Sequence, residues 1–205
     1  MIKNTKINDS GLYKVINYIE KFKRGTIWTV DDFKEINGLT YTNIRTILVN
    51  LCDMKVLIRV CRGVYCYPKI EGGMPVFPAI INVLSKLSER EHYEICPVGE
   101  YAEYLLGLRN TIPNNVLCYN NYKIKTINFE NGISVKMLPS KKLFSSFIKK
   151  KELRMLIYYI NKVDISKITN NQKEKLIDYY YKLDEDSRME AKKTSSFILD
   201  FLGIK

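Results

Sequence analysis

One short segment of the chain carries side chains suited to hydrogen bonding with a nucleic acid. Between residues 40 and 53, a helical repeat of 100° per residue places hydroxyl and amide groups around one arginine, opposite an apolar stripe, and no acid occurs before Asp53. Such a face can approach phosphates without repulsion and can hydrogen-bond to base edges. The candidate contacts are Thr42, Asn43, Arg45, Thr46 and Asn50. An ordinary solvated helix face is the alternative interpretation of this pattern.

A short hairpin predicted after this helix carries two more arginines that could reach DNA. Residues 56–61 and 64–67 are rich in β-branched and aromatic side chains, and Arg62-Gly63 between them supplies a turn. We expect Arg59 and Arg62 to lie on the tip of this hairpin, where an arginine can contact a backbone phosphate or the minor groove. Helix and hairpin together predict one DNA-contacting surface.

The elements before the hairpin give the order of a winged helix-turn-helix domain. Apolar residues at helical spacing predict a first helix over residues 10–24. Thr29 suits the cap of a second helix, which Asn37-Gly38 should end, and Thr40 suits the cap of the third. This order of helices and hairpin belongs to a fold that lays one helix in the DNA major groove. We therefore predict a winged helix-turn-helix DNA-binding domain over residues 1–70.

The rest of the chain predicts a second domain over residues 71–205. The Gly- and Pro-containing segment 71–75 is the best candidate for a linker. The central part combines short helices with strands, and Asn131-Gly132 predicts a β-hairpin there. Helical spacing of apolar residues predicts that the last third is helical. The elements expected in the centre are helices from residue 78 and over 99–106, an extended piece at 95–97, and strands at 116–119, 122–129 and 133–137. The predicted fold class is α+β.

The charge distribution favours a polyanionic partner. The formal net charge is +11, and it is concentrated at the two ends: residues 1–70 hold 12 Lys and Arg against 6 Asp and Glu, and residues 141–205 hold 15 against 9. Basic surfaces attract phosphate backbones because binding releases counterions. A candidate second phosphate-binding patch consists of Lys141, Lys142, Lys149, Lys150 and Lys151. A solvated start of a helix is the alternative interpretation of these lysines.

Enzymatic and metal-dependent classes are not favoured. The sequence has no glycine-rich phosphate loop, and it lacks the Gly-Ser followed by paired aspartates that is typical of nucleotidyltransferases. The only histidine, His92, lies in a polar segment and has no second ligand at metal spacing. Glu130 and Lys136, across the predicted hairpin turn, are too few groups for a metal-dependent nuclease. We therefore predict no catalytic residues, no metal and no cofactor, and a protein that is not an enzyme.

Cysteine usage and hydropathy predict a cytoplasmic protein without a membrane anchor. The five cysteines form no CxxC pair, which indicates reduced thiols. The N-terminal residues lack the apolar segment of a signal peptide. No apolar run approaches the roughly 18 residues that span a membrane.

Two segments resemble a known protein family. The first opens with GTIWTVDDF at Gly25 and closes with VLIRVCRGVYCYPK at Lys69, and the second is GEYAEYLLGLRNTIP at residues 99–113. Both are similar to the AbiEi family, which consists of antitoxins of bacterial type IV toxin–antitoxin (abortive infection) systems. The resemblance extends over residues 10–140 and covers the C-terminal third only in outline.

The resemblance implies a transcriptional autorepressor that binds double-stranded DNA at repeats in its own promoter. Its C-terminal domain would counteract a cognate nucleotidyltransferase-type toxin, without a stable complex in the type IV scheme. Helix-turn-helix domains bind half-sites in pairs, and the sequence leaves open whether these are dimers or cooperative monomers. The alternatives are a stand-alone winged-helix transcription regulator whose C-terminal domain binds a ligand or a protein, and a nucleic-acid-processing enzyme.

Overall fold

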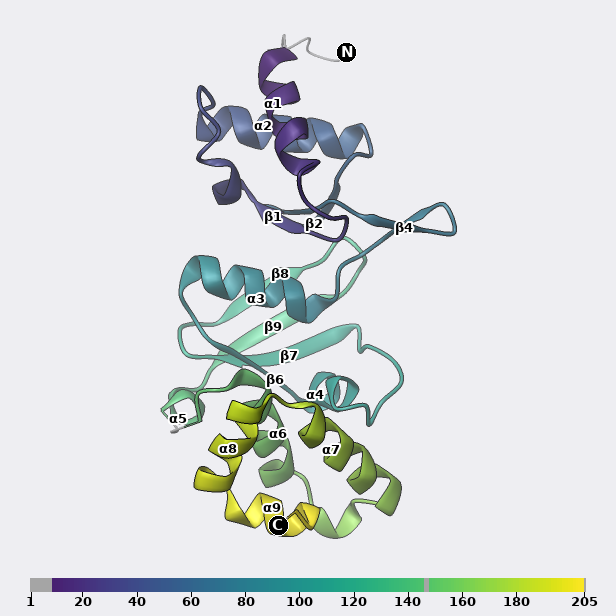
Figure 1. Cartoon of the computed structure of the whole chain (residues 1–205), viewed down its shortest axis with the longest axis vertical. Helices are drawn as coiled ribbons and strands as arrows, with labels where there is room; N and C mark the ends of the chain where they lie inside the picture. The colour runs from purple at the N-terminus through teal and green to yellow at the C-terminus, as the bar shows by residue number, and fades with distance from the viewer. Residues whose placement is uncertain (1–8, 146–147, 205) are drawn as a thin grey trace. The chain divides into compact units, whose positions relative to one another are not determined.

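The structure, a computed structural model, describes residues 9–145 and 148–204 (Figure 1). Helices and small sheets both occur along the chain, so the predicted α+β class is confirmed. The chain divides into two compact units with separate hydrophobic cores. Of the described residues, the first unit comprises those up to Leu87 together with Asn128–Gly132, and the second comprises Ser88–Ile127 together with those from Ile133 onward. The functional boundary expected at residue 70 stays a prediction.

The first unit packs helices against a three-stranded sheet. Its elements begin with α1 (Asp9–Ile19), β1 (Ile27–Thr29), the 3-10 helix η1 (Val30–Phe33), α2 (Tyr41–Asp53), β2 (Ile58–Cys61) and β3 (Val64–Cys66). The sheet is antiparallel with the order β1-β3-β2, and Arg62-Gly63 joins β2 to β3 as predicted. Val15, Trp28, Phe33 and Leu48, from four different elements, meet in the core of this unit.

The second predicted helix is replaced by a strand and a single helical turn. Ile27–Thr29 pairs with β3, with Trp28 opposite Tyr65, as suits its β-branched and aromatic residues. Asp32 Oδ2 then accepts hydrogen bonds from the backbone N–H and the hydroxyl of Thr29, at 2.6 and 2.9 Å, and these bonds fix one tight turn. Val30 and Phe33, the buried residues of the turn, are three apart, which is the repeat of a 3-10 helix.

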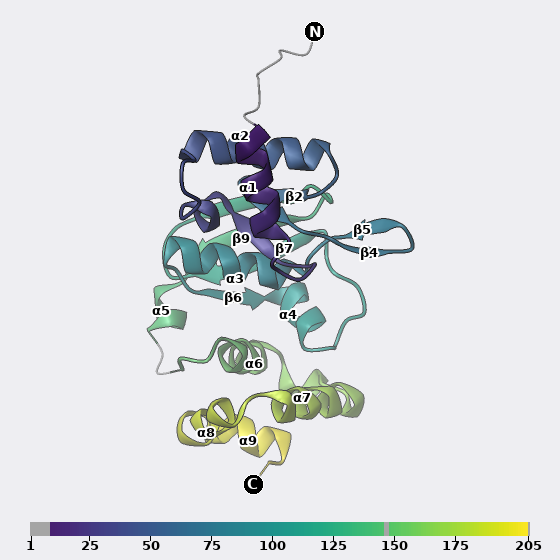
Figure 2. The same ribbon diagram turned by 45° about the horizontal axis from the view of Figure 1, so that its top comes forward.

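The segment expected to be a linker forms a second hairpin instead. Strands β4 (Lys69–Glu71) and β5 (Met74–Val76) pair antiparallel around Gly72-Gly73. Both glycines have positive φ, +56° and +79°, which a two-residue hairpin turn requires at its two central positions. The β4–β5 hairpin projects from the sheet of its unit (Figures 1 and 2). The next helix, α3 (Ile80–Glu91), confirms the predicted helix after residue 78.

The second unit contains a four-stranded sheet whose strands were largely predicted. Its elements are β6 (Ile95–Val98), α4 (Gly99–Leu105), β7 (Asn115–Asn120), β8 (Lys125–Asn128) and β9 (Ser134–Pro139). The strand order is β6-β7-β9-β8, with β6 antiparallel and β9 parallel to β7. Alternating burial along β9, where Val135 and Met137 are buried, matches the period-2 pattern of the sequence.

Helices form the remainder of the second unit, as predicted. They are α5 (Lys141–Phe144), α6 (Lys151–Lys162), the 3-10 helix η2 (Ile165–Lys167), α7 (Asn170–Lys182), α8 (Glu185–Thr194) and α9 (Ser196–Leu202). Helix α6 packs against β6 of the sheet and against α7 and α8 (Figure 2), and it buries Leu153, Leu156 and Ile160 there. The Asp184 side chain caps α8 by accepting a hydrogen bond from the Ser187 backbone N–H. Among the helices of the described residues, none is both long and apolar enough to cross a membrane.

Candidate nucleic-acid interface

Helix α2 presents the polar face that its sequence predicts. The Thr40 hydroxyl caps the helix by accepting a 3.2 Å hydrogen bond from the Asn43 backbone N–H. Ile44, Ile47, Leu48 and Leu51 are buried on the inner side. Thr42, Asn43, Arg45 and Thr46 are all exposed, so the structure brings these four candidates together on the outer side of one helix. Their side chains are available to a partner without rearrangement of the backbone.

Asn50 differs from the other candidates on α2. Its side chain is only partly exposed, and its buried Nδ2 atom has no hydrogen-bond partner among the described residues. A buried hydrogen-bond donor without a partner costs free energy, so a binding partner that brings an acceptor to this amide would recover that free energy. The position of Asn50 at the border of the face therefore suits a contact that forms only on binding.

Two further exposed residues lie on the α2 face but were not among the candidate contacts. Tyr41 is 54% exposed and lies one turn before Arg45, and Val49 is 42% exposed one turn after it. A tyrosine hydroxyl can donate to a phosphate, and an apolar side chain can contact the methyl group of thymine. The repeat of 100° per residue already places Val49 on the outer face, whereas Tyr41 is identified only by its exposure in the structure.

The charges of Arg45 and Arg59 both act on the hydroxyl of Tyr65. Burial raises the pKa of the Tyr65 hydroxyl, and the positive charges of Arg59 and Arg45 partly offset this rise, so both guanidinium groups lie within electrostatic range of it. Burial likewise raises the pKa of the Cys52 thiol to about 11, against a smaller lowering by Arg59. The α2 candidate Arg45 and the hairpin candidate Arg59 thus both lie within electrostatic range of Tyr65.

Arg59 has an acidic partner that the sequence did not reveal. Its Nε atom lies 3.5 Å from Glu130 Oε1, and both side chains are about half exposed. Glu130 comes from the turn between β8 and β9, whose backbone bonds to β2: the Glu130 N–H donates to the Val60 carbonyl at 2.9 Å. The partner therefore partly neutralises Arg59 within the first unit.

Arg62 lies at the β2–β3 turn, as predicted, and is exposed there. Its neighbour Gly63 has a φ of +75°, which the tight turn requires and glycine adopts at little cost. In the part of the chain that the structure describes, Arg62 and Arg45 form no ion pair, and neither does the exposed Lys55 just after α2. These three exposed side chains therefore carry positive charge that no acid among the described residues compensates.

The second lysine patch is not uniform. Lys141 and Lys142 lie on α5, whereas Lys149 and Lys150 directly precede α6 and Lys151 is its first residue. Lys150 Nζ is 3.5 Å from both Asp184 and Asp186, and these carboxylates raise its pKa against the opposing effect of desolvation. The backbone N–H groups of Lys149 and Lys150 donate to Glu190. Carboxylates at the N-cap and on α8 thus lie close to Lys149 and Lys150. Phosphate binding by all five lysines stays a prediction.

The described residues contain no group of three or more His, Cys, Asp or Glu side chains placed to hold a metal ion. Burial raises the pKa of the Cys66 thiol to about 11 and the pKa of the Cys96 thiol to about 12. These thiols are protonated at neutral pH, which makes them poor nucleophiles.

A family model for a family of unknown function, DUF6088, matches residues 14–188. The chain belongs to this family. A comparison with curated proteins gives no match.

Proposed function

We propose that this protein is a DNA-binding transcriptional autorepressor whose first unit acts as a winged helix-turn-helix. The observation that carries the proposal is the acid-free outer face of α2 with Arg45 at its centre, together with the exposed Arg62 on the β2–β3 turn. The chain order α1-β1-η1-α2-β2-β3 and the β1-β3-β2 sheet support this assignment. In it, η1 stands for the short second helix and the β2–β3 turn for the wing.

The proposed binding mode follows from the chemistry of the surface. Helix α2 enters the major groove, where Arg45 donates two hydrogen bonds to the O6 and N7 atoms of a guanine. Thr42, Asn43 and Thr46 bond to neighbouring base edges or phosphates, and Asn50 gains an acceptor for its buried amide. Arg62 contacts a phosphate beside the groove. Binding occurs at promoter repeats, either as a dimer or as cooperative monomers.

We further propose that the protein serves as an antitoxin in the cytoplasm and has no catalytic activity. Support comes from the resemblance of residues 10–140 to the AbiEi family. The second unit would then counteract a cognate nucleotidyltransferase-type toxin, without forming a stable complex with it. Co-expression tests this part: growth arrest by a toxin encoded beside this gene should be relieved by the full chain and by the Arg45→Ala variant alike. If no neighbouring toxin is neutralised, the antitoxin assignment fails while DNA binding is unaffected.

A stand-alone winged-helix transcription regulator with a ligand-binding second unit is the competing proposal. The cavity between the sheet and α6 of that unit favours it. The two proposals share the DNA-binding surface and differ only in what the second unit recognises.

Fluorescence anisotropy with a labelled duplex tests the DNA-binding proposal. The duplex carries the region upstream of the gene, and a shuffled duplex of equal composition is the comparison. We expect tighter binding to the native duplex and an affinity that falls steeply with salt, because phosphate contacts release counterions. Equal affinity for both duplexes would show that α2 does not read sequence.

A further inference from the structure

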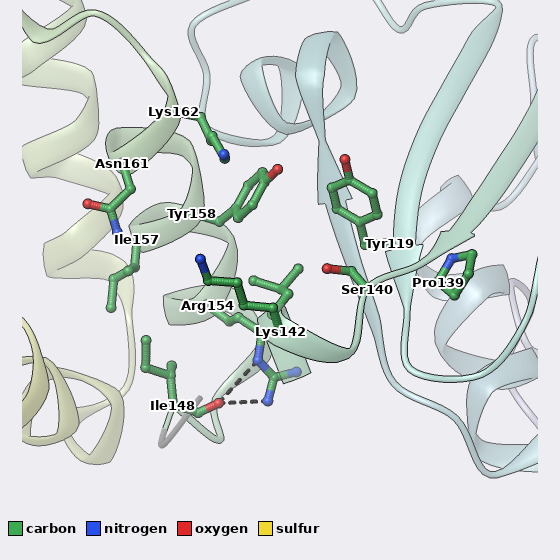
Figure 3. A pocket seen from close by; sticks show the side chains of 11 residues that line it. Tyr119, Pro139, Ser140, Lys142, Ile148, Arg154, Ile157, Tyr158, Asn161 and Lys162 are labelled. Carbon is green, nitrogen blue, oxygen red and sulfur yellow. Dashed lines mark hydrogen bonds between the residues drawn. The ribbon is translucent and has the colours of Figure 1, made fainter. Parts of the chain in front are cut away.

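The second unit contains an open cavity of about 610 Å³, within the range of roughly 300–1,000 Å³ that is typical of small-molecule sites (Figure 3). One wall comes from the sheet and its continuation, with Tyr119 and Ser140, and the opposite wall comes from α6, with Tyr158 and Lys162. Leu143, Ile148 and Ile157 supply apolar lining. The cavity thus combines an apolar interior with polar groups from two elements.

All charged side chains that line the cavity are positive. Its lining includes Lys142, Arg154 and Lys162 and no aspartate or glutamate. Arg154 is compensated by an ion pair with Glu94. Lys142 and Lys162, by contrast, form no ion pair within residues 9–145 and 148–204, unlike Lys150 nearby in the sequence. Two ammonium groups are therefore available to an anion from outside the chain.

The contacts of Arg154 hold the walls of the cavity in place without a bound ligand. Its side chain is 3% exposed, and its Nε and Nη2 atoms donate to the Ile148 carbonyl at 3.1 and 2.6 Å (Figure 3). Its Nη1 atom donates to Glu94, just before β6, and the guanidinium carbon lies 4.9 Å from the centre of the Phe144 ring. One buried side chain of α6 thereby ties down α5, the chain before α6 and the start of β6.

Hydrogen-bond donors and aromatic rings face the same space. The rings of Tyr119 and Tyr158 meet edge to face with centroids 5.7 Å apart. Burial, together with a hydrogen bond to Tyr119, raises the pKa of Tyr158 to about 12, so this hydroxyl stays protonated at neutral pH. Lys162 Nζ lies 5.8 Å from the Tyr158 ring centroid, which places its charge over the aromatic part of the lining.

We propose that this cavity binds a small phosphate-bearing molecule with a planar ring, of the mononucleotide type. The ring lies against the tyrosine and isoleucine side chains, and the phosphate lies between Lys142 and Lys162. A phosphate monoester carries about −1.5 to −2 charges at pH 7 and so balances two lysines, whereas a carboxylate carries only one. The size of the cavity suits a small molecule, and the proposal does not depend on DNA binding by the first unit.

Isothermal titration calorimetry of the full chain with adenosine 5′-monophosphate tests the proposal. We expect saturable binding with one site, and binding at least about tenfold weaker for adenosine and for inorganic phosphate, each of which lacks half of the recognised chemistry. Lys142→Ala and Lys162→Ala should each weaken binding of the monophosphate about fivefold, as is typical for loss of one exposed charge contact.

Lys182→Ala is the matched control, since it removes the same charge from an exposed position in the last turn of α7 and does not line the cavity. Its affinity should equal that of the parent, and thermal unfolding should show that all variants are folded. The proposal is overturned if the monophosphate does not bind saturably, if inorganic phosphate binds as tightly as the monophosphate, or if Lys182→Ala weakens binding as much as Lys162→Ala.

Discussion

Substitutions at Arg45 and Arg62 separate base recognition from charge attraction in the proposed DNA complex. Arg45 lies at the centre of the α2 face, and Arg62 lies on the β2–β3 turn. Loss of a bidentate arginine–guanine contact costs about 1–3 kcal/mol, a factor of about 5 to 150 in Kd, and only on the recognised sequence. Loss of a phosphate contact weakens binding to all sequences and lowers the salt slope by about one.

Arg45→Lys sharpens this distinction because it keeps the charge and removes the planar pair of donors. We expect Arg45→Lys to bind the shuffled duplex like the parent and to lose most of the preference for the native duplex. Arg62→Ala should instead keep the preference and weaken both complexes in parallel. The measurement is fluorescence anisotropy over a series of salt concentrations for each variant and each duplex.

A matched control comes from the second unit. Lys182→Ala removes one exposed positive charge from the last turn of α7, outside the proposed surface, and should leave affinity and salt slope unchanged. The assignment of α2 and the β2–β3 turn as the DNA-contacting elements is refuted if Arg45→Lys and Arg62→Ala both bind like the parent, or if Lys182→Ala loses as much affinity as they do.

Three further outcomes test the electrostatics and packing. Glu130→Gln removes the ion-pair partner of Arg59 and with it one negative charge near the proposed DNA-contacting surface. DNA affinity, measured by fluorescence anisotropy at low salt, should therefore rise by up to about fivefold, and an unchanged affinity would place Glu130 away from the DNA. Leu48→Ala empties a fully buried position behind the α2 face and should lower the free energy of unfolding by about 2–5 kcal/mol in urea titration, whereas the exposed Thr46→Ala should change it by less than about 0.5 kcal/mol. Hydrogen bonds from Ser187 hold the pKa of Asp184 in the folded protein below its ordinary value of 3.8. The ionised carboxylate therefore stabilises the fold above pH 3.8, and this contribution is lost as the pH falls through the lower pKa of the folded state. Asp184→Asn should flatten this part of the acid unfolding curve, and an unaltered curve would contradict the stabilising role of the carboxylate.

Features that depend on neighbouring positions were predictable from the sequence. The polar face of α2 follows from a repeat of 100° per residue over thirteen residues, so exposure of Thr42 and Arg45 opposite Leu48 could be expected without knowledge of the fold. The Arg62-Gly63 turn and the strand after Asn131-Gly132 follow from local turn chemistry in the same way. Glu130 as the partner of Arg59 could not be predicted, because the two residues are 71 positions apart in the sequence and no periodic pattern connects residues at such a separation.

Contacts between segments that are distant in the sequence also explain why the predicted second helix and the predicted linker were wrong. Ile27–Thr29 is a strand because β3 lies beside it, and residues 71–75 are part of a hairpin because Gly72-Gly73 lets β4 and β5 pair. In both cases short segments without a clear period took the structure that hydrogen bonding to another strand offered. The sequence by itself thus determined the α+β class and the outer face of α2, since both rest on local spacing. Only the tertiary structure decided which arginine is neutralised and where Tyr119, Lys142, Arg154 and Lys162 enclose a cavity, because contacts between distant segments depend on how whole elements pack.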